Sequence, residues 1–591
     1  MLRFLSTVLA VVTGLFLFVI LLFVVLGALV AGSSAKKAMP RTVVLELDLR
    51  QKISDAPSSG MHGFGGANLS VVGIVDALQK ASADPAVKGL YIRSGSSFAL
   101  APAQLQEIRS AIVDFKKSGK FAIAHIQDLV EPSIGGYYLA SVGTEVWMQP
   151  SGGINSQGLS SSSLFFKGTL DKLDSSAQVL NYYEYKTAMH PLIYDDFTPP
   201  QKEESLRLMQ GVFDSFTGEI AAARGVKPDE FRAKLAGTPY IGEEAVKAGW
   251  VDKLGFDIEA EDAAKAKAGK DAKTVAIEDY YEHAGSAYTK GAVIAFVEGD
   301  GMIVEGKEES RLFGSSSMMA GDTVSEALLA AADDKDVKAI IFRVNSPGGS
   351  AIASDQIWYA VSRAQKKGKP VIIDMSGVAA SGGYWVSMGA DKIIAEPTTI
   401  TGSIGVVGGK FILKGIYDKL GIHVGELSVG GDRMHMLSDQ HPFTPEEWLA
   451  LRKTFDAVYS EFTHKVASGR NIPLDQVLSN AKGRAWIGTD AKERGLVDEL
   501  GGLKEAIAAA KKLAKIEPAA PVQLRHFPGH KSFFEVLFGA MGASAQAAHA
   551  LSVISDVLEL APSAKMIDEL KRAQTLDHDG VQAIARPVTI H

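Results

Sequence analysis

The sequence predicts an α/β protein made of two copies of one domain, preceded by a single transmembrane helix. Short apolar runs alternate with helical patterns over residues 40–516, which is typical of parallel strands joined by helices. The segment from Phe197 (FTPPQKEESLRLMQGVFDSF) matches the segment from Phe443 (FTPEEWLALRKTFDAVYSEF), 246 positions later. The same offset relates Tyr240 to Trp486. Such a duplication predicts two tandem domains of the same fold.

Residues 1–39 are predicted to form a membrane anchor. No charged residue lies between Arg3 and Lys36, and the 24 residues from Val8 to Ala31 are apolar almost throughout. As a helix over about 8–31, this stretch would be about 36 Å long, which is enough to span a bilayer. It exceeds the apolar core of an ordinary cleavable signal, so an uncleaved anchor is expected, with cleavage after Ser33-Ser34-Ala35 as the alternative.

The first repeat is expected over residues 40–265. It opens with a strand within 40–49 (RTVVLELDL), followed by a loop over 56–68 that is rich in Gly, Ser and Pro. The runs KGLYIR and KFAIAHI predict two more strands, with a helix over 103–117 between them. Residues 266–290 are interpreted as a connector, since the segment 260–273 is rich in Ala, Lys and Asp and suggests a helical or mobile stretch.

The second repeat is expected over residues 291–516. Its predicted strands begin with GAVIAFVEGDGMI from Gly291 and continue with 339–344, 370–375 and 392–395. Helices are predicted over 354–366 and 381–388. The tail 517–591 is expected to be helical. Its apolar side chains would pack on the body or on another subunit, with contact to a membrane surface as the alternative.

Composition excludes several classes of function. The net charge of −7 without basic clusters argues against a nucleic-acid partner. The absence of cysteine excludes disulfides, thiolate metal sites and a cysteine nucleophile. No P-loop, HExxH or paired metal-ligand spacing is present, so neither a metal nor a cofactor is expected.

Ser381, in GVAASGGYWVSMGA, is a candidate nucleophile. It stands at a predicted strand-to-helix turn, where a helix N-terminus presents free N–H groups, and the glycines after it let a substrate backbone approach. The competing interpretation is an ordinary N-cap serine. The first copy has Ile134 at the matching position, so only the second copy retains the hydroxyl.

The turn NSPGGS over 345–350 is a candidate oxyanion loop. It follows a predicted buried strand, and its backbone N–H groups could stabilise an oxyanion together with the N–H of Gly382. The alternative is a plain Pro-Gly turn. The first copy carries SGSSFA there, so both acyl-transfer elements fall in the second copy.

A nucleophilic serine needs a base, and Lys186 in YYEYKTAMHP is the main candidate. A free lysine has a pKa near 10.4, so desolvation would have to lower that pKa by roughly three units. The expected apolar wall comprises Tyr182, Tyr183, Tyr185, Met189 and Pro191. An exposed strand lysine is the alternative role. At the matching place the second copy offers Asp432 or Arg433.

Two further possibilities remain open at the candidate site. A Ser-His-Asp triad would require one of the histidines that follow Ser381, which are His423, His435 and His441 in the region nearest to it. Ser403, in TITGSIGVVG, could orient a neutral lysine. Its repeat mate Ser156 equally favours a structural turn.

The motifs VNSPGGS, AASGGYW, TGSIGV and YKTA resemble those of the long, duplicated bacterial signal peptide peptidases of peptidase family S49. The resemblance covers about residues 1–515. It implies Ser381 as nucleophile and Lys186 as general base, with Gly348 stabilising the oxyanion, Gly382 as a second donor and Ser403 bonded to the lysine. It also implies two Clp-protease and crotonase-like domains built from ββα units that wind into a superhelix.

The same resemblance implies a membrane-anchored serine endopeptidase that degrades released, apolar signal peptides through an acyl-enzyme. Family members are homotetramers on the bacterial cytoplasmic (inner) membrane, single-pass, with the catalytic body in the periplasm. The charges at Lys36, Lys37 and Arg41 conflict with that orientation, since positive-inside counting puts the body in the cytoplasm. The alternatives are a crotonase-like acyl-CoA enzyme, a catalytically silent membrane scaffold and a peptidase that faces the cytoplasm.

Overall fold

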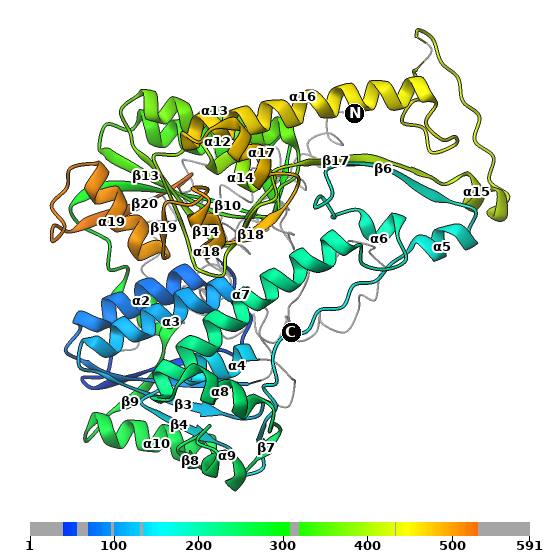
Figure 1. The fold of residues 1–591 in the computed structure, drawn as a ribbon. Coiled ribbons are helices and arrows are strands. Elements are labelled where there is room, and N and C mark those ends of the chain that lie inside the picture. Colours follow the sequence, from blue (N-terminus) through cyan, green and yellow to red (C-terminus); the bar gives the residue numbers. More distant parts are fainter. Residues whose placement is uncertain are drawn as a thin grey trace, which may run out of the picture.

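The computed structural model describes residues 39–55, 69–95, 100–129, 134–307, 318–431 and 433–529. Figure 1 shows two α/β halves stacked on each other, with an arm that projects from one side. The N-terminal half contains one large sheet and the C-terminal half the other. The predicted anchor over 8–31 lies outside the described residues. Within those residues, no helix combines the length and apolar character that a membrane crossing requires.

The first sheet has six strands in the order β8-β4-β3-β2-β1-β9, and all neighbouring pairs are parallel. Helix α10 (Asp257–Ala268) packs on one face, and α2, α3 and α4 lie on the other. The strands are β1 (Val43–Asp48), β2 (Val87–Ser94), β3 (Phe121–Ile126), β4 (Glu145–Met148), β8 (Lys253–Leu254) and β9 (Lys273–Ala276). The three helices are α2 (Val71–Ala83), α3 (Pro102–Lys117) and α4 (Ile134–Ala140).

The second sheet follows the order β18-β16-β14-β13-β10-β20, with β15 beside β14 and β19 beside β15. All its pairs are parallel except β16 with β18. The long strand β14 pairs with β15 in its first half and with β16 near its end. The strands are β10 (Ala292–Asp300), β13 (Val337–Ser346), β14 (Val371–Ala380), β15 (Lys392–Ala395), β16 (Ile400–Gly402), β18 (Ala485–Ile487), β19 (Glu499–Leu500) and β20 (Val522–Phe527).

The connector and the tail differ from the sequence prediction. Residues 266–290 contain β9 and α11 (Ile277–Ala284), and β9 pairs with β1 at the edge of the first sheet. Residues 522–527 form β20, which pairs with β10 in the same parallel manner. Each repeat therefore closes with a strand beside its own first strand, because an unpaired sheet edge is available there. The rest of the tail, 530–591, lies outside the described residues.

The second sheet is buried on both faces. Alternate residues of β10 face opposite sides: Ile294 and Phe296 join the core of the first repeat, while Ala295 and Val297 face α12 (Gly321–Asp333) and α13 (Ala351–Lys366). This alternation follows from the two-residue period of a strand. Figure 1 shows α2 and α3 between the two sheets. The two halves thus share one continuous apolar core.

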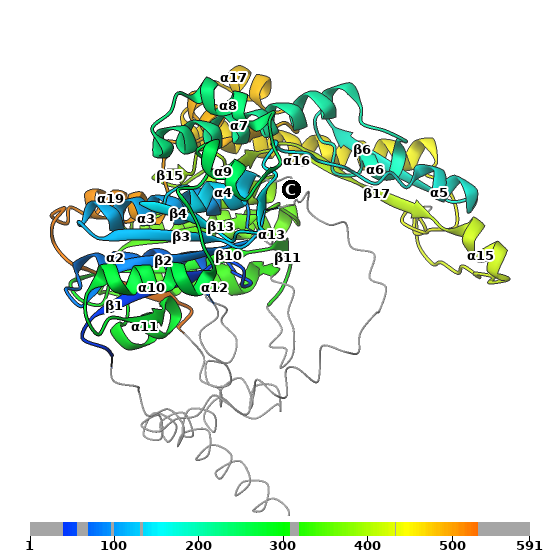
Figure 2. The same ribbon diagram turned by 90° about the horizontal axis from the view of Figure 1, so that it is seen from below.

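The projecting arm joins the two repeats in a different way. Strand β6 (Ser176–Tyr182) from the first repeat pairs antiparallel with β17 (Val406–Ile412) from the second. Figure 2 shows this ribbon extending from the body with the short helices of both repeats at its far end. Those helices are α5 (Lys167–Lys172), α6 (His190–Ile193) and α15 (Lys414–Leu420). At the body, the ribbon ends next to two long helices, α7 (Pro199–Arg224) and α16 (Pro445–Arg470).

The remaining described elements are short or peripheral. Two small strand pairs are formed by β5 (Gly153–Ile154) with β7 (Tyr240–Ile241) and by β11 (Met302–Val304) with β12 (Met318–Ala320). The helices are α8 (Pro228–Leu235), α9 (Glu243–Lys247), α14 (Gly382–Ser387), α17 (Leu474–Asn480), α18 (Gly488–Glu493) and α19 (Leu503–Leu513).

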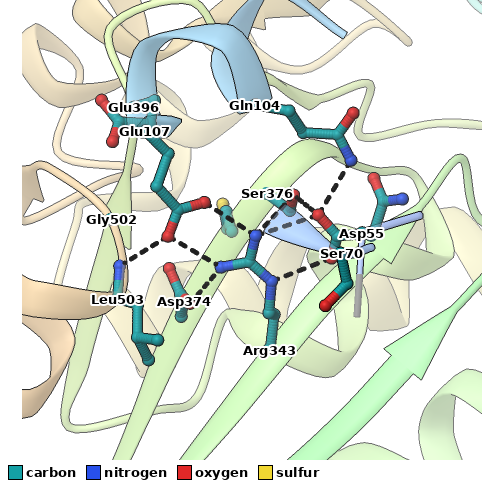
Figure 3. Close-up of polar contacts among 12 residues, drawn as sticks. Asp55, Ser70, Gln104, Glu107, Arg343, Asp374, Ser376, Glu396, Gly502 and Leu503 are labelled. Carbon is teal, nitrogen blue, oxygen red and sulfur yellow. Dashed lines mark hydrogen bonds and ion pairs between the residues drawn. The ribbon is translucent and has the colours of Figure 1, made fainter. Parts of the chain in front are cut away.

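A buried polar cluster connects the repeats between their sheets (Figure 3). Arg343 on β13 donates to Asp55 from Nε at 2.8 Å and to Glu107 from Nη2 at 2.8 Å. Its Nη1 donates to Asp374 on β14 at 2.6 Å. The Arg343 side chain is only 1% exposed, and Glu396 is buried beside the cluster. Burial raises the pKa of Asp374 and of Glu396, and the negative charge of the neighbouring carboxylates adds to this rise.

Candidate active site

Ser381 stands at the turn from β14 to α14. Its backbone φ is 55°, a left-handed value that non-glycine residues rarely adopt. The Ser381 N–H donates to the Gly402 carbonyl at 2.9 Å, which ties the turn to the end of β16. As the residue before α14, Ser381 has the position of an N-cap, but its side chain makes no capping hydrogen bond. The hydroxyl is therefore available for another partner.

The 345–350 turn lies directly on this serine. Gly348 has a φ of 104°, and a Cβ added to it would lie 2.7 Å from the Gly382 nitrogen and 2.8 Å from Ser381 Cβ. Only glycine permits so close an approach. Gly382 is the first residue of α14, so its N–H has no acceptor within the helix. The Gly348 N–H contacts Ser346 Oγ at 3.1 Å, and this contact must open before that N–H can serve an oxyanion.

Lys186 reaches the serine from the other repeat. Its Nζ lies 2.9 Å from Ser381 Oγ, across 195 positions of sequence. The same Nζ lies 2.8 Å from the Ser403 carbonyl oxygen and 3.0 Å from Ser403 Oγ. Three residues that the sequence suggested separately therefore meet at the Lys186 amine, and Lys186 as a whole is 4% exposed.

The hydrogen bonds at Ser403 define how a neutral Lys186 would sit. The single hydroxyl proton of Ser403 points to the Gly483 carbonyl at 3.1 Å, so its oxygen accepts from Lys186. Two N–H groups of a neutral amine would then serve the two Ser403 oxygens. The remaining lone pair would face Ser381 Oγ, as a base for that hydroxyl requires.

Electrostatics favour the neutral amine. Burial lowers the pKa of Lys186 from 10.5 to about 7, and the negative charge of Glu204 opposes this shift. At neutral pH a large fraction of Lys186 is thus unprotonated, whereas a solvated lysine would be almost fully charged.

The loop that carries Lys186 is held by residues from the second repeat. The Tyr183 N–H donates to the Lys482 carbonyl at 3.1 Å. Gly483 lies so close that a Cβ on it would come within 2.5 Å of Lys186 Cβ, and its φ is 82°. Sequence reasoning missed Gly483, since no motif marks it. The signal in the sequence is that a glycine, Gly237, stands at the matching place of the first repeat, 246 positions earlier.

The three tyrosines of the expected apolar wall contact side chains of the second repeat. Tyr182 and Tyr183 pack against Tyr459 of α16, with ring centroids 5.9 Å and 5.2 Å away. Tyr185 instead faces the guanidinium of Arg484, 4.7 Å from its ring centroid. These ring contacts attach the loop that carries Lys186 to α16 and to Arg484.

The other sequence candidates lie apart from this centre. His435 lies beside Glu426, and His441 Nδ1 contacts the Pro442 carbonyl, both in the segment after α15. The side chain found next to Ser381 Oγ is Lys186 instead. Arg433 is exposed, and Asp432 lies outside the described residues. Within the described part of the chain, no three His, Cys, Asp or Glu side chains are grouped to hold a metal ion.

Comparison with known proteins identifies the family. The model of peptidase family S49 matches residues 114–272 and 363–517, one match in each repeat, and a Clp protease model matches residues 311–400. Lys186 falls in the first S49 match, Ser381 and Ser403 in the second, and Gly348 in the Clp protease match.

Three relatives agree with these matches. Protease 4 from Salmonella typhi is 30% identical over 85% of this chain and 83% of its own length. The chloroplastic serine protease SPPA of Arabidopsis thaliana is 32% identical over 80% of this chain and 69% of its own. A protein from Enterococcus faecium named as a signal peptide peptidase SppA is 35% identical over 33% of this chain and 56% of its own. The chain therefore belongs to peptidase family S49, is a serine peptidase, and has an α/β fold with two S49 repeats and likeness to Clp protease.

Proposed function

We propose that this protein is a membrane-anchored endopeptidase that uses a Ser381–Lys186 dyad to degrade signal peptides after their release. The observation that carries the proposal is the 2.9 Å contact between Lys186 Nζ and Ser381 Oγ. Membership of a serine peptidase family makes the acyl-CoA and silent-scaffold alternatives unnecessary.

The proposed first half-reaction forms an acyl-enzyme. Neutral Lys186 takes the proton of Ser381 as Oγ bonds to the carbonyl carbon of the scissile peptide. The carbonyl oxygen becomes an oxyanion that the N–H groups of Gly382 and Gly348 stabilise. The lysine ammonium then gives its proton to the leaving nitrogen as the C–N bond breaks.

The second half-reaction restores the enzyme. Lys186, neutral again, takes a proton from water while the water oxygen bonds to the acyl carbon. The tetrahedral intermediate collapses, and Ser381 Oγ leaves with the proton from Lys186 Nζ. Ser403 keeps the amine oriented in both steps through its two contacts.

The substrate class and the location belong to the same proposal. The name of the Enterococcus faecium relative and the apolar run over 8–31 support a peptidase at a membrane surface that receives apolar peptides. In this proposal the protein lies in a bacterial inner membrane and its catalytic body faces the periplasm. A periplasm-specific reporter fused to the C-terminus should be active, and activity of a cytoplasm-specific reporter alone would reverse this orientation.

A homotetramer is proposed as the working assembly, with the arm as a subunit contact. Near the end of the arm, Leu427 and Val429 are 98% and 95% exposed. Exposed apolar side chains clustered on one projection are typical of an interface. The double variant Leu427→Asp, Val429→Asp should sediment as a smaller species than the wild type in the same detergent. An unchanged sedimentation coefficient would contradict an arm-mediated contact.

Three single variants of the full chain in detergent test the dyad, assayed with a fluorogenic apolar peptide. Lys186→Met and Ser381→Ala should each lower kcat by at least about 1000-fold, because base and nucleophile act as one unit. Ser403→Ala should lower kcat about tenfold, since one hydrogen bond to the amine is lost.

The matched control is Ser156→Ala, the same change at the repeat mate of Ser403, which should keep full activity. Thermal unfolding of each variant establishes that it is folded. Substantial activity in folded Lys186→Met would refute the dyad and direct the search to another base.

A further inference from the structure

Behind the candidate active site lies a buried carboxylate that the mechanism above does not use. Glu204 belongs to α7 and is 7% exposed. Its Oε1 accepts the N–H of Ala485, the first residue of β18, at 2.6 Å. Burying a glutamate carboxylate costs free energy unless the carboxylate is paired or hydrogen-bonded, so glutamates are rarely buried without a structural or chemical role.

The segment that Glu204 holds, Lys482–Ala485, forms one side of the site. Gly483 makes the close approach to Lys186 described above. The Gly483 carbonyl accepts the Ser403 hydroxyl at 3.1 Å, and the Arg484 carbonyl accepts the Ser403 N–H at 2.7 Å. A shift of this segment would therefore move both the amine and the serine that orients it.

The charges around Glu204 come from three elements. Arg484, just before β18, and Lys186, after β6, are positive, and Glu203 on α7 is negative. The Arg484 guanidinium is itself engaged by Glu203, with Nη2 to Oε1 at 2.6 Å. No salt bridge to Glu204 occurs among the described residues. Arg484 is thus paired with Glu203, and the charge that acts on Lys186 is that of Glu204.

We propose that Glu204 is a positioning residue of this site: it fixes the Lys482–Ala485 segment against Lys186 through the Ala485 N–H and places a negative charge near the amine. Because Lys186 is the base in the proposed function, this role rests on that function. The two parts of the role, a hydrogen bond and a charge, are separable by substitution.

The charge should raise the affinity of Lys186 for its proton. Glu204 opposes the lowering of the Lys186 pKa that burial causes. Burial in turn raises the pKa of Glu204 to about 7, with the Ala485 N–H and the charges of Arg484 and Lys186 opposing that rise. Removing the charge should lower the pKa of Lys186, so the neutral base should persist to lower pH.

The test is the pH dependence of kcat/KM for the full chain in detergent. Glu204→Gln keeps an oxygen that can accept the Ala485 N–H but removes the charge. Because the Glu204 pKa is itself about 7, only part of its charge is present across the acid limb, so we expect that limb to move to lower pH by about half a unit, with little change in the plateau. Glu204→Ala removes the oxygen as well, so we expect the plateau of kcat to fall about tenfold in addition.

Glu203→Gln is the matched control, since it removes the same charge one residue away. The Glu203 side chain is 51% exposed, so solvent screens its charge. The acid limb of Glu203→Gln should therefore stay close to that of the wild type. Glu204→Asp provides a converse variant that keeps the charge on a shorter side chain. It should leave the limb near the wild-type position and lower kcat.

Two results would overturn the role of Glu204. One is a Glu204→Gln limb that moves no further than the Glu203→Gln limb. The other is a Glu204→Asp limb that moves as far as that of Glu204→Gln. Lys186→Met measured in parallel separates the proposals: if it is inactive while the Glu204→Gln limb is unmoved, only the role of Glu204 fails. If Lys186→Met is active, the Ser381–Lys186 dyad itself is refuted.

Discussion

Burial strongly lowers the affinity of the Lys186 amine for a proton. The amine contacts Ser381 and Ser403, and neither residue carries a charge that would hold the ammonium. Its pKa of about 7 follows from this desolvation. A group with such a pKa can both take and release a proton near neutral pH, which a general base that later acts as an acid must do.

At the residue scale, activity should depend on pH through Lys186. The neutral amine is the active form, so kcat/KM should fall as pH drops through about 7 and level off above it. The measurement is hydrolysis of an apolar peptide by the full chain from about pH 5 to about pH 10 in overlapping buffers. An acid limb near pH 10, the value for a solvated lysine, would contradict a desolvated base.

Single residues also mark the limit of sequence reasoning. Ser381 and Lys186 could be singled out because glycines, a turn and an asymmetry between the repeats surround them. Glu204 and Gly483 could not. Their significance comes from contacts with residues that lie far away along the chain, at Ala485 and Lys186 respectively.

At the scale of elements, the short segment between α17 and β18 determines the position of the base. Gly483→Ala should lower kcat about 100-fold, because the new methyl group would press on Lys186 and a displacement of about 1 Å can cost that much. The change is measured as kcat of the folded variant with the apolar peptide.

Gly421→Ala is the matched control for this substitution. Gly421 has a φ of 68°, similar to the 82° of Gly483, but a Cβ there would meet nothing within 4 Å. It therefore carries the same backbone cost without the clash and should keep its activity. Equal losses in the two variants would mean that backbone strain, and not contact with Lys186, explains the effect of Gly483→Ala.

The predicted elements differ from the observed ones mainly where pairing extends them. The strand expected over 392–395 coincides with β15, because its apolar run has clear ends. The strand expected over 370–375 continues as β14 to Ala380, where its second half pairs with β16. The edge strands β9 and β20 were not predicted, since their sequences are short and half polar and become strands by pairing with β1 and β10.

At the scale of the whole molecule, the Arg343 cluster should contribute strongly to the stability of the packing between the two repeats. Arg343→Met should lower the free energy of unfolding by about 3–5 kcal/mol, because three buried carboxylates lose the guanidinium that pairs with them. The loss should shrink at lower pH, where protonated carboxyl groups no longer need the positive charge. Urea unfolding of the full chain, followed by tryptophan fluorescence, measures both effects.

Lys504→Met is the control for this prediction, since Lys504 pairs with Asp114 across the same two repeats. The Lys504 side chain is 59% exposed, so its ion pair should contribute at most about 1 kcal/mol. Similar losses for the two variants would show that burial adds nothing to the Arg343 cluster.

The β6–β17 ribbon has a consequence for how the enzyme acquires activity. It interleaves one strand from each half, as exchanged arms do in a swapped dimer. Two separate subunits would have to find each other, and their activity would fall on dilution. With both halves in one chain, the partner is always at a high effective concentration. Formation of the Ser381–Lys186 contact is therefore a unimolecular event, independent of how sparsely the protein is expressed.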